Sequence, residues 1–245
     1  MTPQDSLCLI PAKGASTRLP GKNLLPLGGH PLVAHSIRKA AVAGAFGTIC
    51  VSTEDPELAE VAKSYGADVP FLRPDHLSRD PATIVDVALH ALDHYLSAGR
   101  SFERVCILLP TTPFILLRDI SEALALFAAS QAEALMSVTP AEFPPFNAWL
   151  IEGTGNGSRM QACFPNSPYK HVKSTECPTA YRSNGAIVVA DVAALREYKT
   201  YYHSAPVPFV MPQERSTDID IHHEYRIAQL LWDNGVVETD EGLFR

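Results

Sequence analysis

The first 140 residues alternate between short apolar runs and longer segments in which apolar residues recur at helical spacing. Short apolar runs predict buried strands, and a repeat of 3.6 residues predicts helices. The predicted strands cover residues 7–11, 48–53, 68–71, 104–109 and 133–139. The predicted helices cover residues 31–45, 55–65, 81–97 and 117–130. This alternation is typical of an α/β protein with a parallel sheet that is covered on both faces.

The alternation breaks between residues 140 and 180. This stretch contains six prolines and the glycine-rich tract GTGNG at 153–157. Prolines and glycines at this density mark loops and turns, so we expect a projecting subdomain or arm rather than another layer of the sheet. Regular structure is expected to resume with strands at 185–190 and 208–211 and a final helix at 221–232. We therefore expect one domain over residues 1–245, from which residues of about 140–180 project.

The composition excludes several classes of function. The 245 residues carry 20 Lys and Arg against 27 Asp and Glu, and no basic run reaches five residues, so we expect no nucleic-acid partner. The longest uncharged apolar stretch, 105–117, contains Pro110 and Pro113 and is too short to cross a membrane. The N-terminus lacks a basic region followed by a long apolar core, so we expect no export signal. Five cysteines without a C-x-x-C pair favour a cytoplasmic protein with reduced thiols.

The loop at residues 12–23 is the first candidate site. Ligands of parallel sheets bind at the carboxyl ends of strands, where this loop and those after residues 53 and 109 are expected to lie. Its small residues allow backbone N–H groups to approach an anion, and Lys13, Arg18 and Lys22 add three cations within ten residues. This combination suits a nucleotide triphosphate, although an ordinary solvated loop is the alternative.

The same loop does not match the common phosphate-binding motifs. Six residues separate Gly14 from Gly21 where a Walker loop needs four, and Asn23 stands in place of the Ser or Thr. No G-x-G-x-x-G motif is present, which counts against a dinucleotide-binding domain.

Asp218 and Asp220 form the second candidate site. They alternate along the predicted extended segment STDIDI at 216–221, so both carboxylates share one face and Ile219 points the opposite way. Paired carboxylate oxygens are suitable ligands for a hard cation. The alternative is that Asp220 caps the helix predicted to begin at residue 221.

Several motifs in this order make the chain similar to a known family. They are IPAKGASTRLPGKNL at 10–24, VSTED at 51–55, VPFLRP at 69–74, LSRD at 77–80, PTTP at 110–113, YRSNGAI at 181–187 and STDID at 216–220. The chain thereby resembles the acylneuraminate cytidylyltransferases, the CMP-sialic acid synthetases, from about residue 9 to residue 231. The resemblance is weakest over residues 140–180.

The resemblance implies a Rossmann-like nucleotide-diphospho-sugar transferase of the GT-A-like type, with a mostly parallel sheet sandwiched by helices and a projecting dimerisation arm. It implies transfer of CMP from CTP to an acylneuraminate-like nonulosonic acid with release of pyrophosphate, in a homodimer that uses Mg2+. Nucleotide-binding roles fall on Lys13, Ser16, Arg18, Lys22, Asn23 and Arg73. Sugar-binding roles fall on Arg73, Tyr201 and Tyr202, metal-binding roles on Asp218 and Asp220, and the main catalytic roles on Lys22 and Asp218.

Departures from the family pattern gather on the sugar side. Leu109 stands where Gln is common and Ile115 where Arg is frequent, while Lys13, to which the resemblance gives a nucleotide-binding role, stands where the family usually has Arg. Residues 173–176 replace an arginine-bearing stretch. An altered nonulosonate, such as a legionaminic-type sugar, is therefore plausible, and a pseudaminate is less expected because residues 181–187 keep the sialate-type pattern.

Two alternatives stay open on the sequence. A CMP-Kdo synthetase (3-deoxy-manno-octulosonate cytidylyltransferase) has a similar opening loop, but proline normally follows where Asn23 stands and its acidic motif differs. The other alternative is a non-catalytic protein that binds sugar nucleotides. The presence of Lys22, Asp218 and Asp220 together counts against it, because binding alone would not require all three.

Overall fold

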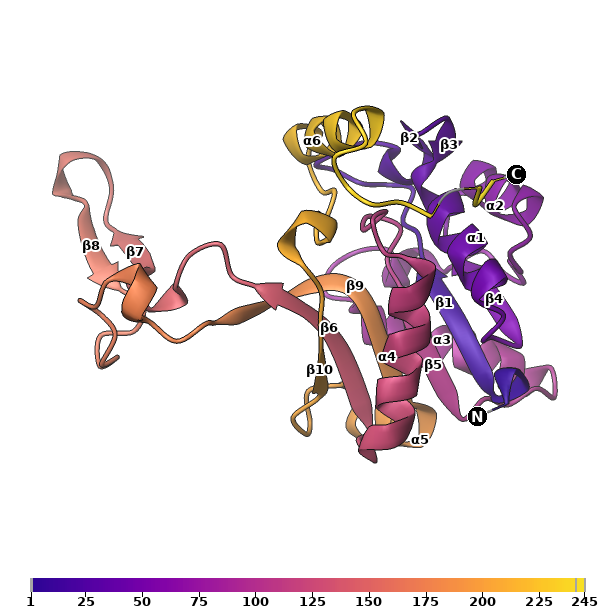
Figure 1. Ribbon diagram of the computed structural model, residues 1–245. Coiled ribbons are helices and arrows are strands. Elements are labelled where there is room, and N and C mark those ends of the chain that lie inside the picture. The colour runs from indigo at the N-terminus through magenta and orange to yellow at the C-terminus, as the bar shows by residue number, and fades with distance from the viewer. Residues whose placement is uncertain (1, 241, 245) are drawn as a thin grey trace.

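The computed structural model describes residues 2–240 and 242–244 and contains a six-stranded sheet with the order β10-β6-β9-β5-β1-β4 (Figure 1). Its strands are β1 (Ser6–Pro11), β4 (Thr48–Ser52), β5 (Arg104–Leu108), β6 (Ala134–Pro140), β9 (Tyr181–Asp191) and β10 (Val207–Val210). β1 pairs in parallel with β4 and β5, and β10 pairs in parallel with β6. β9 runs antiparallel between β5 and β6. The sheet is therefore mostly parallel, as the apolar pattern predicts.

Helices cover both faces of the sheet. They are α1 (Leu32–Ala43), α2 (Pro56–Ser64), α3 (Ile84–Ser97), α4 (Leu117–Ser130), α5 (Val192–Tyr198) and α6 (His222–Asp233). Alternate residues of β1 show the layering, since Cys8 and Ile10 belong to a core with α1, α2 and α4. Leu7 and Leu9 belong to a second core with α3 and α5. This period of two places apolar side chains on both faces, which is the pattern of a buried strand.

Two local expectations are corrected by the structure. The predicted strand at 68–71 is wrong, because only Asp68 bridges to Cys50 before Pro70, which has no N–H to donate, and the chain leaves the sheet edge. The helix predicted from residue 81 begins at Ile84, because Thr83 and Asp86 cap it by exchanging hydrogen bonds of 2.7 and 3.2 Å. The sequence pattern also gives no sign of α5 or of the antiparallel direction of β9.

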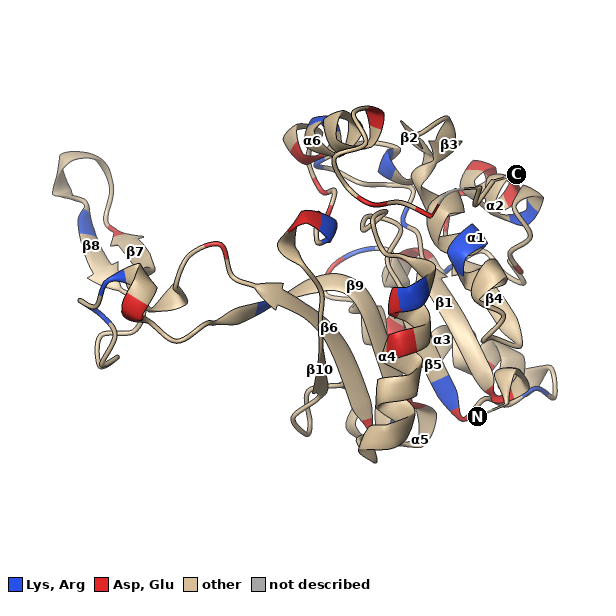
Figure 2. Ribbon diagram, viewed as in Figure 1, with Lys and Arg blue, Asp and Glu red and all other residues tan. Residues whose placement is uncertain are grey.

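An arm leaves the body between β6 and β9 and projects far from the sheet (Figure 1). Its base is closed by a hydrogen bond of 2.8 Å from the N–H of Ala141 to the carbonyl of Ala180. Its outer part holds the antiparallel hairpin of β7 (Trp149–Glu152) and β8 (Arg159–Ala162). Figure 2 shows that most of this hairpin is uncharged, and its exposed apolar side chains are Trp149, Leu150, Ile151 and Met160. The arm thus presents apolar surface that the body does not cover.

A further small sheet, formed by β2 (Pro26–Leu27) and β3 (His30–Pro31), follows the first loop and packs near α6. Among the described residues, none of the helices has the length and apolar character needed to cross a membrane.

Candidate active site

A pocket of about 310 Å³ lies where the loops after β1 and β5 meet the segment before α6. Its lining is formed by Pro11, Lys13, Ser16, Thr17, Arg18, Lys22, Asn23, Leu109, Pro110, Thr111, Asp218 and Asp220. The structure therefore brings together the two candidate sites that the sequence places about 200 residues apart. The position is the one expected for ligands of a parallel sheet, outside the carboxyl ends of the strands.

Two cations of the first loop meet Asp220 directly. The Nζ atom of Lys22 lies 2.7 Å from Oδ1 of Asp220, and Nη2 of Arg18 lies 2.5 Å from Oδ2. Asn23 holds the loop from inside, since its Nδ2 donates to the carbonyl of Lys13 over 2.8 Å. No ion pair of Lys13 with a carboxylate is found in the described part of the chain. Three cations thus line one pocket, and two of them pair with a single carboxylate.

The two aspartates have different electrostatic environments. Burial and the neighbouring carboxylate of Asp220 raise the pKa of Asp218 above its ordinary value. Burial also opposes ionisation of Asp220, but Lys22 and Arg18 outweigh it and lower the pKa of that carboxyl. Oδ1 of Asp218 is buried and has no hydrogen-bond partner among the described residues. A buried acceptor without a donor is costly, so this oxygen is available for a ligand.

The alternation predicted for this segment is confirmed, and the capping alternative is wrong. Asp218 and Asp220 both line the pocket, whereas Ile219 is fully buried in a third apolar core with Leu19 and Leu27. The N-cap position of α6 is occupied by Ile221 rather than by Asp220. The carboxylate of Glu224 accepts hydrogen bonds from the N–H groups of residues 220 and 221, over 2.7 and 3.0 Å. Asp220 is therefore free to use both oxygens in the pocket.

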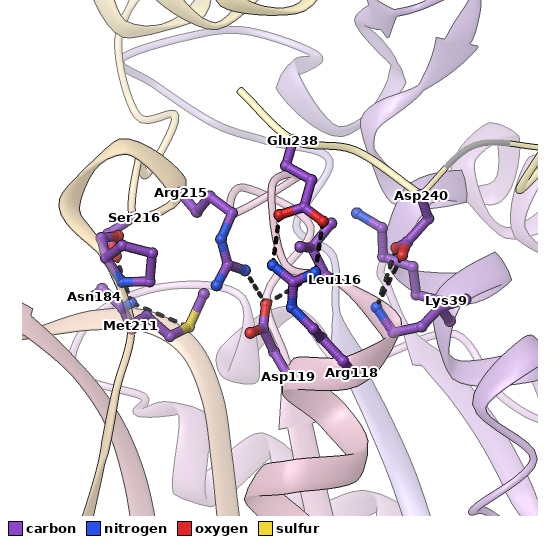
Figure 3. A network of polar contacts seen from close by, with 12 residues as sticks. Lys39, Leu116, Arg118, Asp119, Asn184, Met211, Arg215, Ser216, Glu238 and Asp240 are labelled. Carbon is purple, nitrogen blue, oxygen red and sulfur yellow. Dashed lines mark hydrogen bonds and ion pairs between the residues drawn. The ribbon is translucent and has the colours of Figure 1, made fainter. Parts of the chain in front are cut away.

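A buried polar network holds the aspartate segment in place (Figure 3). Asn184 of β9 donates through Nδ2 to Oγ of Ser216 over 2.9 Å and to the sulfur of Met211. The Oδ1 atom of Asn184 accepts from the hydroxyl of Ser137 over 2.6 Å. The N–H of Ile219 donates to the carbonyl of Thr111 over 2.8 Å. The segment is thus fixed to β6, β9 and the loop after β5.

Close packing adds to this arrangement at Gly185, which has a φ of 70°. A side chain there would be strained, and its Cβ would lie 3.0 Å from the Leu109 side chain and 3.6 Å from Oδ2 of Asp218. The Asn-Gly pair of β9 therefore supports Asp218 through both a hydrogen-bond network and a tight backbone approach.

Ion pairs join the same segment to α4 and the C-terminal residues (Figure 3). Arg215 pairs with Asp119, and both side chains are buried, with exposures of 9% and 3%. Arg118 pairs with Glu238, and the carboxylate of Asp240 accepts from the N–H of Leu117. These contacts fix the chain on both sides of the aspartates to the amino end of one helix.

Arg73 lies beside a second, adjoining pocket of about 190 Å³ that shares Pro11, Lys13 and Leu109 with the first. Its side chain is 4% exposed and lies 2.7 Å from Oε2 of Glu54. Sequence reasoning gives Glu54 no role, although it stands in the VSTED motif directly after a strand of the sheet. Its position at the carboxyl end of β4 is the signal that could have identified it.

Tyr201 and Tyr202 are not among the residues that line either pocket. Their rings lie 4.6 Å apart, and Tyr201 packs against the core that α3 and α5 share. The hydroxyl of Tyr202 approaches the sulfur of Met136 at 3.5 Å. Their sugar-binding role stays a prediction.

The fold and the pocket define an α/β protein with a pocket at the carboxyl ends of its strands that is lined by three cations and two carboxylates. The profile of the family described as "Cytidylyltransferase" matches residues 7–224. The chain therefore belongs to the cytidylyltransferase family, and it is a nucleotidyltransferase.

Relatives that match over more than nine-tenths of this chain support this assignment. The chain is 31% identical to the pseudaminic acid cytidylyltransferase of Campylobacter jejuni over 93% of its own length and 96% of that protein. It is 30% identical to the CMP-N,N'-diacetyllegionaminic acid synthase of Legionella pneumophila over 92% and 95%. It is 29% identical to the N-acylneuraminate cytidylyltransferase of Escherichia coli, over 91% of this chain and 51% of that protein. The identities of 31% and 30% are too similar to distinguish a pseudaminic acid from a legionaminic acid acceptor, so the preference against a pseudaminate stays a prediction.

The expected fold class is confirmed by solved structures. A CMP-2-keto-3-deoxy-manno-octonic acid synthetase complexed with CTP superposes with a TM-score of 0.69 at 16% identity, covering 94% of this chain and 99% of that one. A 4-diphosphocytidyl-2C-methyl-D-erythritol synthase from Anaerococcus prevotii superposes with a TM-score of 0.62 at 11% identity, covering 93% and 98%.

Proposed function

We propose that this protein transfers CMP from CTP to a nonulosonic acid, and that it does so as a cytoplasmic homodimer in the synthesis of a surface glycan. The observation that carries the proposal is that Lys22 and Arg18 pair with Asp220 in the same pocket that Asp218 lines. The names of the relatives at 30% and 31% identity support a nine-carbon acidic sugar as the acceptor.

The pocket residues suit the binding of a nucleoside triphosphate. Lys13 and Lys22, with Arg18, supply positive charge to the phosphates, and Ser16 and Asn23 shape the loop that carries them. Arg73, in the adjoining pocket, is assigned to the nucleotide and sugar. Such a reaction depends mainly on positioning and on charge stabilisation, so a covalent nucleophile is not required.

The donor set also suits Mg2+. Asp218 brings a buried oxygen with no other partner, and Asp220 faces the same pocket. Mg2+ favours one or two carboxylates together with substrate phosphates, and among the described residues no larger cluster of His, Cys, Asp and Glu is found. When bound, the ion would neutralise phosphate charge and polarise the oxygens around the reacting phosphorus.

In the proposed reaction the anomeric 2-hydroxyl of the sugar attacks the α-phosphorus of CTP. The new bond is between that oxygen and phosphorus, the proton of the hydroxyl is released to solvent, and the bond to pyrophosphate breaks on the opposite side with its electron pair staying on pyrophosphate. Lys22 and Arg18 stabilise the charge that passes to the leaving pyrophosphate, while Asp218 orients the attacking side of the site.

Pyrophosphate release from CTP and Mg2+ tests the proposal, with legionaminic, pseudaminic and N-acetylneuraminic acids and Kdo as acceptors. We expect release with at least one nonulosonic acid and a loss of at least about 100-fold in the Asp218→Asn variant. Asp93→Asn, a surface change on α3 where the side chain is 61% exposed, is the matched control and should retain activity. CTP binding without release on any acceptor would favour the non-catalytic alternative.

Release with Kdo alone would instead favour the CMP-Kdo synthetase. One observation supports that candidate, namely 39% identity to the 3-deoxy-manno-octulosonate cytidylyltransferase of Nitrobacter hamburgensis over 51% of this chain. The nonulosonic acid synthases match over more than nine-tenths of the chain, which is why the nonulosonic acid is preferred.

The homodimer is proposed through residues of about 140–180. Support comes from the apolar side chains that the arm exposes, with Ile151 75% and Met160 64% accessible. Exposed apolar surface of this kind marks an interface. Light scattering should give twice the mass of 26.6 kDa, and a fully active monomer would contradict the proposal.

A further inference from the structure

Glu54 joins two segments that line different pockets. Its Oε1 atom accepts hydrogen bonds from the N–H groups of Gly14 and Ala15, over 2.9 and 3.0 Å. Its Oε2 atom accepts from Nη2 of Arg73 over 2.7 Å and from the hydroxyl of Ser78 over 3.1 Å. One carboxylate therefore connects the first loop with the segment that carries Arg73.

The first loop is held tightly at this point. A Cβ on Gly14 would lie 2.5 Å from Cβ of Asp55, so the loop backbone rests directly on the turn that contains Glu54. On the other side, Asn23 binds the carbonyl of Lys13. Lys13 lines both pockets and is the residue before Gly14, so the contacts of its neighbours determine where its charge lies.

Glu54 itself does not line either pocket. All four of its contacts are donors from the protein, and an ionised carboxylate accepts without donating. Burial opposes ionisation of Glu54, but the N–H of Ala15 and the guanidinium of Arg73 outweigh it and lower the pKa of this carboxyl. The group is thus ionised at neutral pH and fully engaged within the protein.

We propose that Glu54 is a positioning residue for cytidylyl transfer. It holds the loop of residues 12–23 and Arg73 at a fixed separation, so that the pocket lined by the loop and the adjoining pocket lined by Arg73 can bind one nucleotide together. This inference rests on the transfer of a cytidylyl group and is independent of the identity of the sugar.

Hydrogen exchange in the absence of substrates tests the contact directly. Glu54→Gln keeps the shape, but its amide offers one acceptor oxygen and one NH2 group, so one of its two sides places donor against donor. The side that meets the NH2 group is loosened, so we expect the peptide covering residues 12–18 or the one covering residues 72–78 to exchange about tenfold faster than in the wild type. Glu57→Gln, an exposed change in the first turn of α2, is the matched control and should leave the exchange unchanged. Equal exchange in Glu54→Gln and wild type would overturn the proposal.

Steady-state kinetics then separate positioning from catalysis. For Glu54→Gln we expect the KM for CTP to rise about tenfold while kcat changes less than about threefold, because saturating CTP restores the loop. A fall in kcat with an unchanged KM would mean that Glu54 acts in the reaction itself. If Glu54→Gln does not fold, Glu54→Asp replaces it, since that carboxylate keeps its charge but is too short to reach both segments. Wild-type exchange and KM in Glu54→Asp would likewise overturn the proposal.

Discussion

The pairing of Lys22 and Arg18 with Asp220 predicts that removal of the Asp220 carboxylate increases the affinity for CTP. In the pocket, Asp220 forms ion pairs of 2.7 and 2.5 Å with the two cations that a triphosphate requires. CTP must separate these pairs and approach a negative charge unless a divalent cation neutralises Asp220. The Asp220→Asn variant should therefore bind CTP more tightly than the wild type when no divalent cation is present.

The expected gain in binding free energy follows from how exposed the paired side chains are. Lys22 and Asp220 are 15% and 30% exposed, so their pair lies between a surface pair and a buried one. Exposed ion pairs contribute about 0.2–1 kcal/mol, and hydrogen bonds to charged groups about 1.5–3 kcal/mol. A gain of about 1–2 kcal/mol corresponds to a Kd for CTP that is lower by about 5- to 30-fold.

Calorimetric titration with CTP in EDTA measures this directly, and a second titration in Mg2+ supplies the comparison. In Mg2+ the advantage of Asp220→Asn should disappear, because the wild-type carboxylate then has a cation to bind. Asp93→Asn removes the same charge far from the pocket and should match the wild type in both titrations. An unchanged or weaker affinity of Asp220→Asn in EDTA would refute the reasoning.

Three further predictions concern stability and assembly. Burial lowers the pKa of Lys39 to about 8, so the unfolded chain binds this proton more tightly, and between pH 8 and 10.5 the unfolding free energy of the wild type should gain up to about 3 kcal/mol relative to that of Lys39→Met. Urea titrations of Lys39→Met should lack that gain, and a variant that retains it would contradict the assignment. Arg215→Met leaves Asp119 buried without its cation and should lower the unfolding free energy measured in urea by about 3 kcal/mol. Adding Asp119→Asn in the same chain should restore part of this loss, and additive losses of the two substitutions would argue against the pair. Leu150→Glu with Ile151→Glu changes both faces of the hairpin and should halve the mass in light scattering without lowering the melting temperature, and an unchanged mass would exclude the β7–β8 hairpin from the interface.

Much of the fold could be predicted because it depends on local patterns. The helix at Leu117–Ser130 begins and ends where its apolar spacing predicts, and the alternation at Asp218 and Asp220 follows from a period of two. The strand expected at 68–71 failed because Pro70 has no N–H to donate and because a short apolar run does not reveal that the segment lies at the edge of the sheet. The antiparallel direction of β9 depends on the long connection through the arm, which no local pattern encodes.

The candidate site shows the same division. The cations of the first loop and the aspartates could be found from the sequence, because their residue types and spacing carry the chemistry. Glu54 could be marked as a candidate by its place at the carboxyl end of β4, but its role could not be predicted, because that role depends on the donors at Gly14 and Arg73 that tertiary packing brings to it. The buried support at Asn184 has the same origin, since its partners come from β6 and from the segment between β10 and α6.

The insertion of the arm between β6 and β9 has a consequence for folding. Pro140 pairs with Tyr181 in the sheet, so this central pairing must wait for a long loop to close. Loop closure entropy grows only logarithmically, and a loop of this length costs about 1–2 kcal/mol more than a turn of a few residues. The β7–β8 hairpin is local and can form first, which shortens the part of the loop that is still flexible. The length and sequence of the arm can therefore change without altering the strand register that places Asn184 behind Asp218.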